Sequence, residues 1–337
     1  MRTRRTRTTT LAALAVATLA LAGCGAPGSG GGEAETSATS ASGLATCEPV
    51  AGESLVVLED DQGLQNADNV IPAVNAQVAQ DHPVVLELLD SVSAALDTET
   101  LIELNKAVDI DRRTSSEVAR EFVTDEGLAA DEQTGAGVAL TVGAANFSES
   151  LTLAEVYAEV LRSAGFDAQA QSIGSRETYL PALQDGTLAV VPEYAATLTT
   201  YLGSQVNGPD AESGATSDVD ETVAALTPLA EQSGLVVGAP SAAQDQNAFA
   251  VTAEFAQEHG VETLSELAET CGGLVLAGPP ECPERPFCQL GLQETYGLEI
   301  ADFRSYELSL IGAAVRQGDA AIGLVLSSDG SLAADGD

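Results

Sequence analysis

The sequence predicts an α/β protein with two domains, and three observations support this fold class. From Val138 onward, apolar runs with strand character alternate with segments of helical spacing, the pattern of βαβ units in a parallel sheet. About 290 residues follow the N-terminal region described next, which is enough for two domains of ordinary size. Trp is absent and Gly numbers 32, which is typical of an α/β protein rich in turns.

Residues 1–23 have the form of a bacterial lipoprotein signal peptide. A basic start and a short apolar run precede the small residues before Cys24, and the run is too short to span a bilayer comfortably as a transmembrane anchor. We expect cleavage before Cys24, lipidation of its thiol, and a mature protein anchored to the extracytoplasmic face of the cell membrane. Residues 24–46 then form the anchor and a flexible tether rich in Gly, Ser, Ala and Thr.

The mature chain is strongly acidic. Without the four arginines of the signal peptide it has nine basic against 51 acidic residues, a net charge of −42. Such a charge repels nucleic acid and anionic lipid head groups, so neither is expected as a partner. The charge itself indicates a well-solvated surface and no particular site.

The first part of the mature chain has one strand and three helices. The strand is expected at residues 55–60, and the helices follow from their apolar spacing at 84–96, 98–109 and 115–127. A lone strand cannot form a sheet. This strand must therefore complete a sheet formed by residues elsewhere in the chain.

The second part alternates strands and helices, each predicted from its apolar pattern. Strands are expected at 138–142, 166–173, 187–191, 235–239, 273–278 and 320–326, with an extended crossing between domains at 243–252. Helices are expected at 148–165, 176–186, 195–203, 219–234, 253–259, 263–270, 289–297 and 309–317.

Four cysteines remain after lipidation of Cys24, and an exported chain favours disulfides over a metal site. The short Pro-rich loop "CPERPFC" favours Cys282 with Cys288, which leaves Cys47 with Cys271. Zinc bound with His259 as a fourth ligand is the alternative, although the spacing fits no common zinc pattern. No cofactor is expected.

Four motifs together give the chain a resemblance to a known family. They are "LVVLEDDQGL", "VGAANFSES", "VVPEYAATL" and "LAGPPECPERP", within the span from Leu55 to Asp329. The chain resembles the substrate-binding proteins of ABC transporters for glycine betaine, choline and related quaternary amines. The resemblance implies a two-lobed fold like that of type II periplasmic binding proteins, with ABC permease and ATPase subunits as partners, and we expect a monomer.

In that family the "LEDD" segment and its helices close the chain, whereas here they come first. The resemblance therefore implies a circular permutation, with residues 128–137 joining the family's usual ends. Lobe 1 would comprise residues 64–245, and lobe 2 would comprise 246–337 plus 47–63, so that Cys47 and Cys271 share a lobe. A separate helical domain followed by a truncated binding protein is the alternative.

The family's cleft residues carry over to three positions. The "PEY" motif implies Tyr194 as an aromatic wall for the ligand and Thr197 as a hydroxyl donor, and the Pro-rich loop implies Arg285 as a clamp for a carboxylate. Simple packing of Tyr194 and a surface position for Arg285 are the corresponding alternatives.

The chain departs from the family at other cleft positions. Asp68, Asn247 and Leu326 stand where the family commonly has aromatics, and Ala145 stands where it often has Lys. Asp68 could meet a cation directly. The other polar candidates for ligand binding are Asn146, Asn247 and Ser328, with Tyr179 as a replacement aromatic and Arg176 beside it. Choline, ectoine or an amino-acid-like zwitterion therefore stays open beside glycine betaine.

Two other classes of function compete with transport. An enzyme would need a nucleophile, but the cysteines are expected to pair, His82 and His259 lie in polar contexts, and no G-x-S-x-G motif occurs, so no catalytic residue is expected. A sensory lipoprotein could use the same fold without transport.

Overall fold

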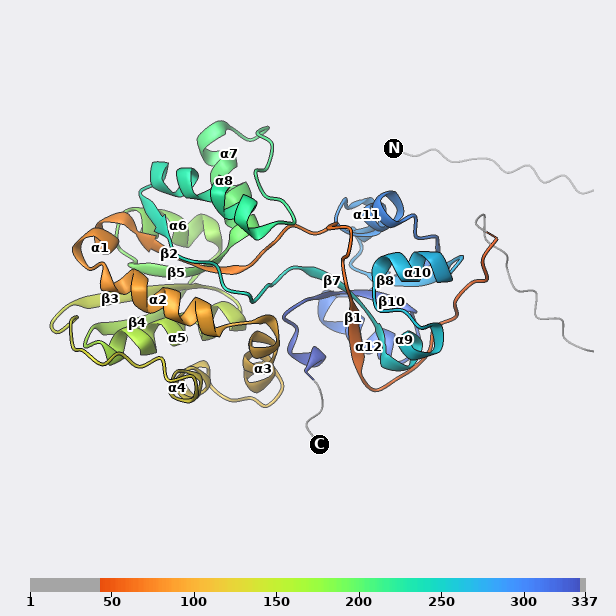
Figure 1. Ribbon diagram of the computed structural model, residues 1–337, viewed down its shortest axis with the longest axis horizontal. Helices are drawn as coiled ribbons and strands as arrows, with labels where there is room; N and C mark the ends of the chain where they lie inside the picture. The colour runs from red at the N-terminus through yellow and green to blue at the C-terminus, as the bar shows by residue number, and fades with distance from the viewer. Residues whose placement is uncertain (1–42, 334–337) are drawn as a thin grey trace, which may run out of the picture. The chain divides into compact units, whose positions relative to one another are not determined.

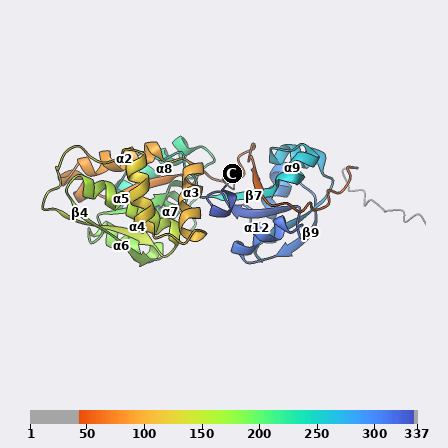
Figure 2. The ribbon, with the colours of Figure 1, turned by 90° about the horizontal axis from the view of Figure 1, so that it is seen from below.

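The computed structural model describes residues 43–333, which form two five-stranded sheets with helices against them (Figures 1 and 2). The predicted signal peptide, Cys24 and most of the predicted tether lie outside the described residues. We use lobe 1 for the sheet of strands β2 to β6 with its helices. Lobe 2 is the sheet of β1 and β7 to β10 with its helices.

Lobe 1 has the strand order β4-β3-β5-β2-β6. Its strands are β2 (Val70–Asn75), β3 (Ala139–Ala145), β4 (Asp167–Gly174), β5 (Val190–Tyr194) and β6 (Leu235–Val237). Its helices are α1 (Ala76–Asp81), α2 (Val84–Ala95), α3 (Thr98–Asp109), α4 (Ser115–Asp125), α5 (Ser148–Ser163), α6 (Arg176–Gln184), α7 (Ala195–Asn207) and α8 (Val219–Gln232).

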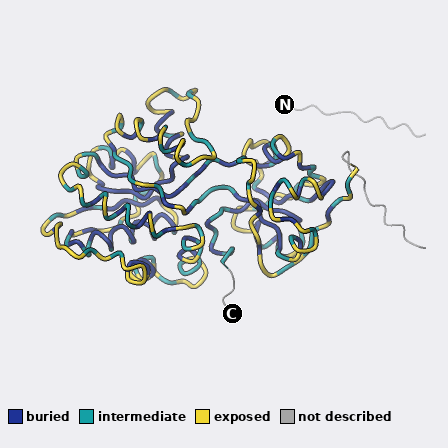
Figure 3. The backbone as a smooth tube through the Cα atoms, in the orientation of Figure 1, coloured by how far each residue is buried: buried dark blue, intermediate teal, exposed yellow. Residues whose placement is uncertain are grey.

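The core of lobe 1 lies on both faces of its sheet because successive strand residues point to opposite sides. In β2, Val70 and Val74 pack with α2 to α5, whereas Ile71 and Ala73 pack with α6 to α8. Figure 1 shows these two groups of helices on opposite sides of the sheet. The buried strands appear as dark blue tube in Figure 3.

Lobe 2 has the strand order β1-β7-β10-β8-β9. Its strands are β1 (Leu55–Leu58), β7 (Asn247–Thr252), β8 (Leu274–Gly278), β9 (Ile300–Ser305) and β10 (Ile322–Leu326). Its helices and helical turns are α9 (Ala253–His259), α10 (Leu264–Thr270), η1 (Cys282–Glu284), α11 (Gln289–Gly291), η2 (Leu292–Tyr296), α12 (Leu308–Arg316) and η3 (Gly330–Leu332).

The early strand β1 belongs to lobe 2, as predicted. It pairs antiparallel with β7, from Leu55 opposite Thr252 to Leu58 opposite Phe249. Leu55 also packs in the same apolar cluster as Leu332, close to the end of the described chain. The prediction that this strand completes a sheet formed by later residues is confirmed, and this pairing argues against a self-contained N-terminal domain.

Two expectations about the sheets are wrong. Both sheets are mixed rather than parallel, because β2 runs antiparallel to β5 and β6, and β7 runs antiparallel to β1 and β10. The segment before Val138 also holds two strands and not one, because it contains β2, which lies between β5 and β6 in the lobe 1 sheet. Its Pro72 lies opposite Pro192 of β5. Proline nitrogens carry no hydrogen, and neither proline has to donate a hydrogen bond to the other in this pair.

Local signals explain where several helices begin and end. Helices α4 and α10 begin with capping boxes, formed by Thr114 with Glu117 and by Thr263 with Glu266. Helix α9 ends at Gly260, whose φ of 64° is left-handed and favours glycine. Among residues 43–333, no helix has the length and apolar character needed to cross a membrane.

Two disulfides link elements of lobe 2. The structure joins Cys47 to Cys271 and Cys282 to Cys288, the pairing that the sequence favours. The Nδ1 atom of His259 lies 3.7 Å from the Sγ atom of Cys47, and His259, Cys47 and Cys271 could together offer ligands to a metal. Because both sulfurs are joined, only reduction would release them as metal ligands.

Candidate functional site

A cavity of about 590 Å³ is lined by residues of both lobes. Its walls combine charged, polar and aromatic side chains. From lobe 1 and the segment that leads into it come Gln65, Asn66, Asp68, Arg176, Ala196, Thr197, Thr200, Tyr201 and Ser204. Asp245, Gln246, Asn247, Phe287 and Leu326 complete the lining.

Asp68 is a half-buried carboxylate in this wall. It accepts hydrogen bonds from the backbone N–H of Thr197, at 2.9 Å, and from the Thr197 hydroxyl. These bonds cap the first turn of α7, where a negative charge is favourable. Burial raises the pKa of Asp68 above its ordinary value, although the bonds from Thr197 and the charge of Arg176 oppose this shift. The predicted Asp68 and Thr197 therefore act together in one wall.

Arg176 reaches the cavity from α6, but its charge is already paired. Its Nε and Nη2 atoms donate to the two carboxylate oxygens of Glu193, at 3.1 and 2.7 Å. Glu193 is fully buried in β5 and also accepts from the Tyr179 hydroxyl at 2.8 Å. Tyr179 thus holds in place the carboxylate that pairs with Arg176, and it does not line the cavity.

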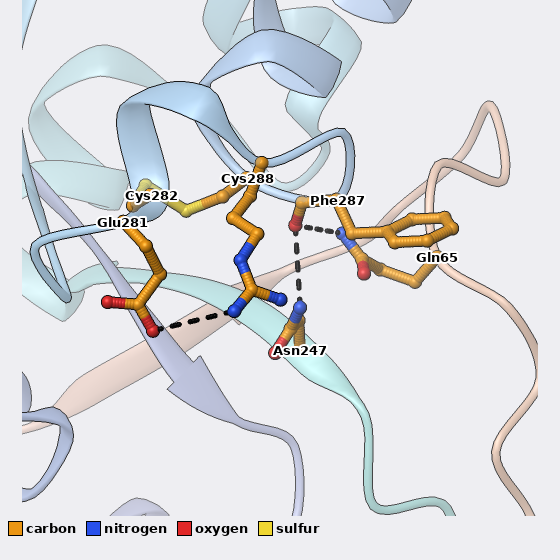
Figure 4. Close-up of a disulfide and its surroundings, with 7 residues drawn as sticks. Gln65, Asn247, Glu281, Cys282, Phe287 and Cys288 are labelled. Carbon is orange, nitrogen blue, oxygen red and sulfur yellow. Dashed lines mark hydrogen bonds and ion pairs between the residues drawn. A yellow bond between two sulfur atoms is a disulfide. The ribbon is translucent and has the colours of Figure 1, made fainter. Parts of the chain in front are cut away.

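Aromatic faces come from Tyr201 and Phe287. The Arg176 guanidinium lies 5.9 Å from the centre of the Tyr201 ring, which orients both side chains. Phe287 is 44% exposed, which is unusual for phenylalanine. Figure 4 shows the Phe287 backbone carbonyl accepting from the side chains of Gln65, at 3.1 Å, and Asn247, at 3.4 Å. The predicted Asn247 thus helps to hold the loop that carries Phe287.

Tyr194 lies behind the cavity and does not line it. Its ring is buried, and its hydroxyl donates to Glu149 at 2.5 Å. Burial, followed by the nearby charge of Glu149, raises the pKa of the Tyr194 hydroxyl above its ordinary value. The Tyr194 ring therefore packs in the lobe 1 core, and its role as an aromatic wall for the ligand stays a prediction.

Three further predicted ligand residues, Asn146, Ser328 and Arg285, also lie outside this lining. Asn146 is exposed after β3, and Ser328 is buried with its hydroxyl donating to Asp245 at 3.0 Å. The Arg285 side chain is 66% exposed, and its Nη2 atom lies 3.8 Å from a carboxylate oxygen of Glu281. Arg285 lines a separate cavity of about 430 Å³ that shares Asn247 and Phe287 with the first. The carboxylate clamp at Arg285 is therefore not assembled with Asp68 and Thr197 in one cavity.

Sequence reasoning missed Tyr201, Phe287 and Asp245 as cavity residues. Helical spacing could have revealed Tyr201, because it follows Thr197 by four positions and shares its face of α7. Asp245 sits among other polar residues in the extended crossing and gives no such signal.

A protein-family model matches most of the described chain. The model of the family described as the substrate binding domain of ABC-type glycine betaine transport systems matches residues 49–125 and 138–336. The chain belongs to this family. The gap between the two matched segments lies where the joining segment 128–137 was expected. The family consists of transport binding proteins rather than enzymes.

Individual relatives match shorter parts of the chain. A glycine-betaine-binding protein of Pseudomonas aeruginosa is 37% identical over 83 residues, which cover 25% of this chain and 27% of that protein. The glycine betaine-binding protein YehZ of Escherichia coli is 31% identical over 88 residues, which cover 26% of this chain and 29% of that protein. The chain thus aligns with less than a third of the length of these relatives.

Solved structures give weaker likenesses. A crystal structure described as a glycine betaine/carnitine/choline ABC transporter matches with a TM-score of 0.45 at 19% identity. The match covers 58% of this chain and 70% of that chain.

Proposed function

We propose that this protein is the lipid-anchored, extracytoplasmic binding subunit of an ABC importer for a small quaternary amine such as choline or glycine betaine. The observation that supports this most is the 590 Å³ cavity with contributions from both lobes. A quaternary ammonium has no hydrogen-bond donor, so it is recognised by aromatic faces and negative charge. Tyr201, Phe287 and Asp68 offer both kinds of group to one volume.

A thermal-shift screen tests this function. The panel is choline, glycine betaine, carnitine, ectoine, proline and amino acids, and a ligand at one hundred times its Kd stabilises the folded state by about 2.7 kcal/mol. A shift with a quaternary amine supports the proposal. A shift with amino acids or ectoine alone would instead support a binding protein for another zwitterion, and no shift with any compound would count against transport of this class.

Removing the exposed aromatic face should weaken the ligand. We expect Phe287→Ala to cost about 1 to 2 kcal/mol of binding free energy for choline, measured by calorimetric titration, because a cation–π contact is lost. Phe147→Ala is a matched control, since Phe147 is 45% exposed and lies outside the cavity lining. Equal effects of the two changes would contradict the assignment of Phe287.

The proposed anchor can be tested separately. We expect the full chain expressed in a bacterium to partition into detergent, and a Cys24→Ser variant to lose this partition because no thiol remains for acylation. Mass spectrometry of the mature N-terminus checks the same point. An unmodified Cys24 in the wild-type protein would contradict the anchor.

A further inference from the structure

Another cavity, of about 440 Å³, has no part in the proposed function. We call it the crossing cavity, because Gln65, Gln244 and Gln246 line it and lie in the two chain segments that pass between the lobes. Strand β1 of lobe 2 contributes Val57, and helix α3 of lobe 1 contributes Ile102. The volume is that of a small-molecule site, which typically measures about 300 to 1,000 Å³.

A large share of the lining of the crossing cavity is apolar. The larger apolar side chains are Leu55, Val57, Leu58, Ile102, Phe249 and Leu332. Val57 is 36% exposed, and Ile102 and Leu332 are partly exposed. A hydrocarbon group in the cavity would cover apolar surface that water now contacts, which is favourable. The lining therefore favours a ligand with a hydrocarbon portion.

The charged residues of the crossing cavity are acidic. Glu59 and Asp60 line it, and no lysine or arginine does so within the part of the chain that the structure describes. The Asp60 carboxylate is already engaged, because it accepts two backbone N–H bonds, at 2.8 and 2.7 Å, and a bond from the Tyr296 hydroxyl. Glu59 is exposed. The lining therefore attracts a cation, with Glu59 as the carboxylate that can meet it.

The side-chain amides of the crossing cavity offer oxygen atoms. Figure 4 shows the side-chain nitrogens of Gln65 and Asn247 donating to the Phe287 carbonyl, at 3.1 and 3.4 Å. The Gln244 side-chain nitrogen donates to Asn69 at 3.3 Å. Because a carbonyl only accepts, the amides of Gln65 and Asn247 keep their oxygens as acceptors. A ligand must therefore bring donors. A primary ammonium group has three N–H donors, whereas a quaternary ammonium has none.

We infer that the crossing cavity is a second binding site and that its ligand is an amphipathic primary amine, a protonated ammonium group on a short hydrocarbon chain. The ammonium group meets Glu59 and the amide oxygens, and the hydrocarbon chain covers the apolar side chains around Val57. The quaternary amine of the proposed function fits this cavity poorly, because it brings no donor to these acceptors.

The crossing cavity is coupled to the 590 Å³ cavity through shared side chains. Gln65, Gln246 and Asn247 line both cavities. A cation in each cavity places two like charges against the same side chains, and like charges repel. We expect each ligand to weaken the other about fivefold, since such coupling is reciprocal. This coupling rests on the proposed function, whereas the site in the crossing cavity does not.

Calorimetric titration with hexylammonium chloride tests the site. We expect one molecule to bind per chain, with saturating choline present or absent. Hexan-1-ol keeps the hydrocarbon chain but lacks the charge, and we expect it to bind at least about tenfold more weakly. Hexanoate should show no binding, because its charge has the same sign as that of Glu59.

Two substitutions test the head group and the hydrocarbon chain separately. Glu59→Gln removes the charge with little change of shape and should weaken hexylammonium about tenfold. Val57→Arg places a cation in the lining and should abolish the binding. The matched controls are Glu53→Gln and Val56→Arg, which should retain it. Glu53 is exposed, Val56 is 39% exposed on the same strand as Val57, and neither lines the cavity.

Absence of hexylammonium binding by the wild-type protein overturns the inference without any variant. Equal affinity of the wild-type, Glu59→Gln and Val57→Arg proteins also overturns it, because the amine then binds elsewhere. Complete exclusion of hexylammonium by saturating choline, rather than a weakening of about fivefold, means that both occupy the 590 Å³ cavity and that the inference is wrong. If neither choline nor glycine betaine binds, the proposed function and the coupling fail, and the titration with hexylammonium still decides the site.

Discussion

Glu193→Ala is expected to lower the free energy of unfolding by about 3 to 5 kcal/mol, because it leaves a largely buried charge without a partner. The Arg176 side chain is 18% exposed and Glu193 is fully buried, so water cannot replace the lost carboxylate well. The Tyr179 hydroxyl loses its acceptor in the same step. Urea unfolding, followed by circular dichroism, measures the loss.

Glu121→Ala provides the matched control. Glu121 also pairs with an arginine, Arg113, but both side chains are exposed, at 55% and 37%. An exposed pair contributes at most about 1 kcal/mol. A loss in Glu193→Ala as small as that in Glu121→Ala would show that the Arg176 charge is well solvated, contrary to the structure.

The disulfide between Cys47 and Cys271 is expected to have the second large effect. Its cysteines are 224 positions apart, so their connection restricts the unfolded chain far more than a short loop does. Replacing both cysteines by alanine should cost about 4 to 5 kcal/mol of stability. Differential scanning calorimetry of the two proteins under non-reducing conditions tests this value.

The second disulfide is a control of the same chemistry. Cys282 and Cys288 are equally buried but only 6 positions apart, and their removal should cost about 2 kcal/mol. Titration of the unfolded wild-type protein with a thiol reagent should find no free thiol at these four positions. Equal losses from the two pairs would mean that strain or residual structure outweighs chain entropy.

Apolar periodicity was sufficient to predict most helices, and it failed for strands whose environment is set by distant residues. Strand β2 contains Pro72, which normally argues against an interior strand, and here it lies opposite Pro192 while its carbonyl accepts from the Gly238 N–H. Strand β9 carries Asp302 and Arg304 on a largely exposed edge, so it offers no apolar pattern. Both strands are defined by pairing with strands far along the chain, which the local sequence pattern does not reveal.

The candidate site was predicted in part for a similar reason. Asp68, Thr197 and Asn247 were found because the family resemblance drew attention to their positions. Tyr194 has the residue type of an aromatic wall, but its ring turns inward because its hydroxyl bonds the buried Glu149. The direction of a side chain depends on partners far along the chain, here 45 residues away.

The position of β1 has a consequence for how the chain folds when it emerges N-terminus first. Lobe 2 uses residues from both ends of the described chain, whereas every strand of lobe 1 lies between Val70 and Val237. The whole lobe 1 sheet emerges before β7, so until then β1 has no strand to pair with and Cys47 has no sulfur partner. A chain that stops after lobe 1 would therefore carry a bare strand and a reactive thiol, which are the features that quality control and aggregation both recognise.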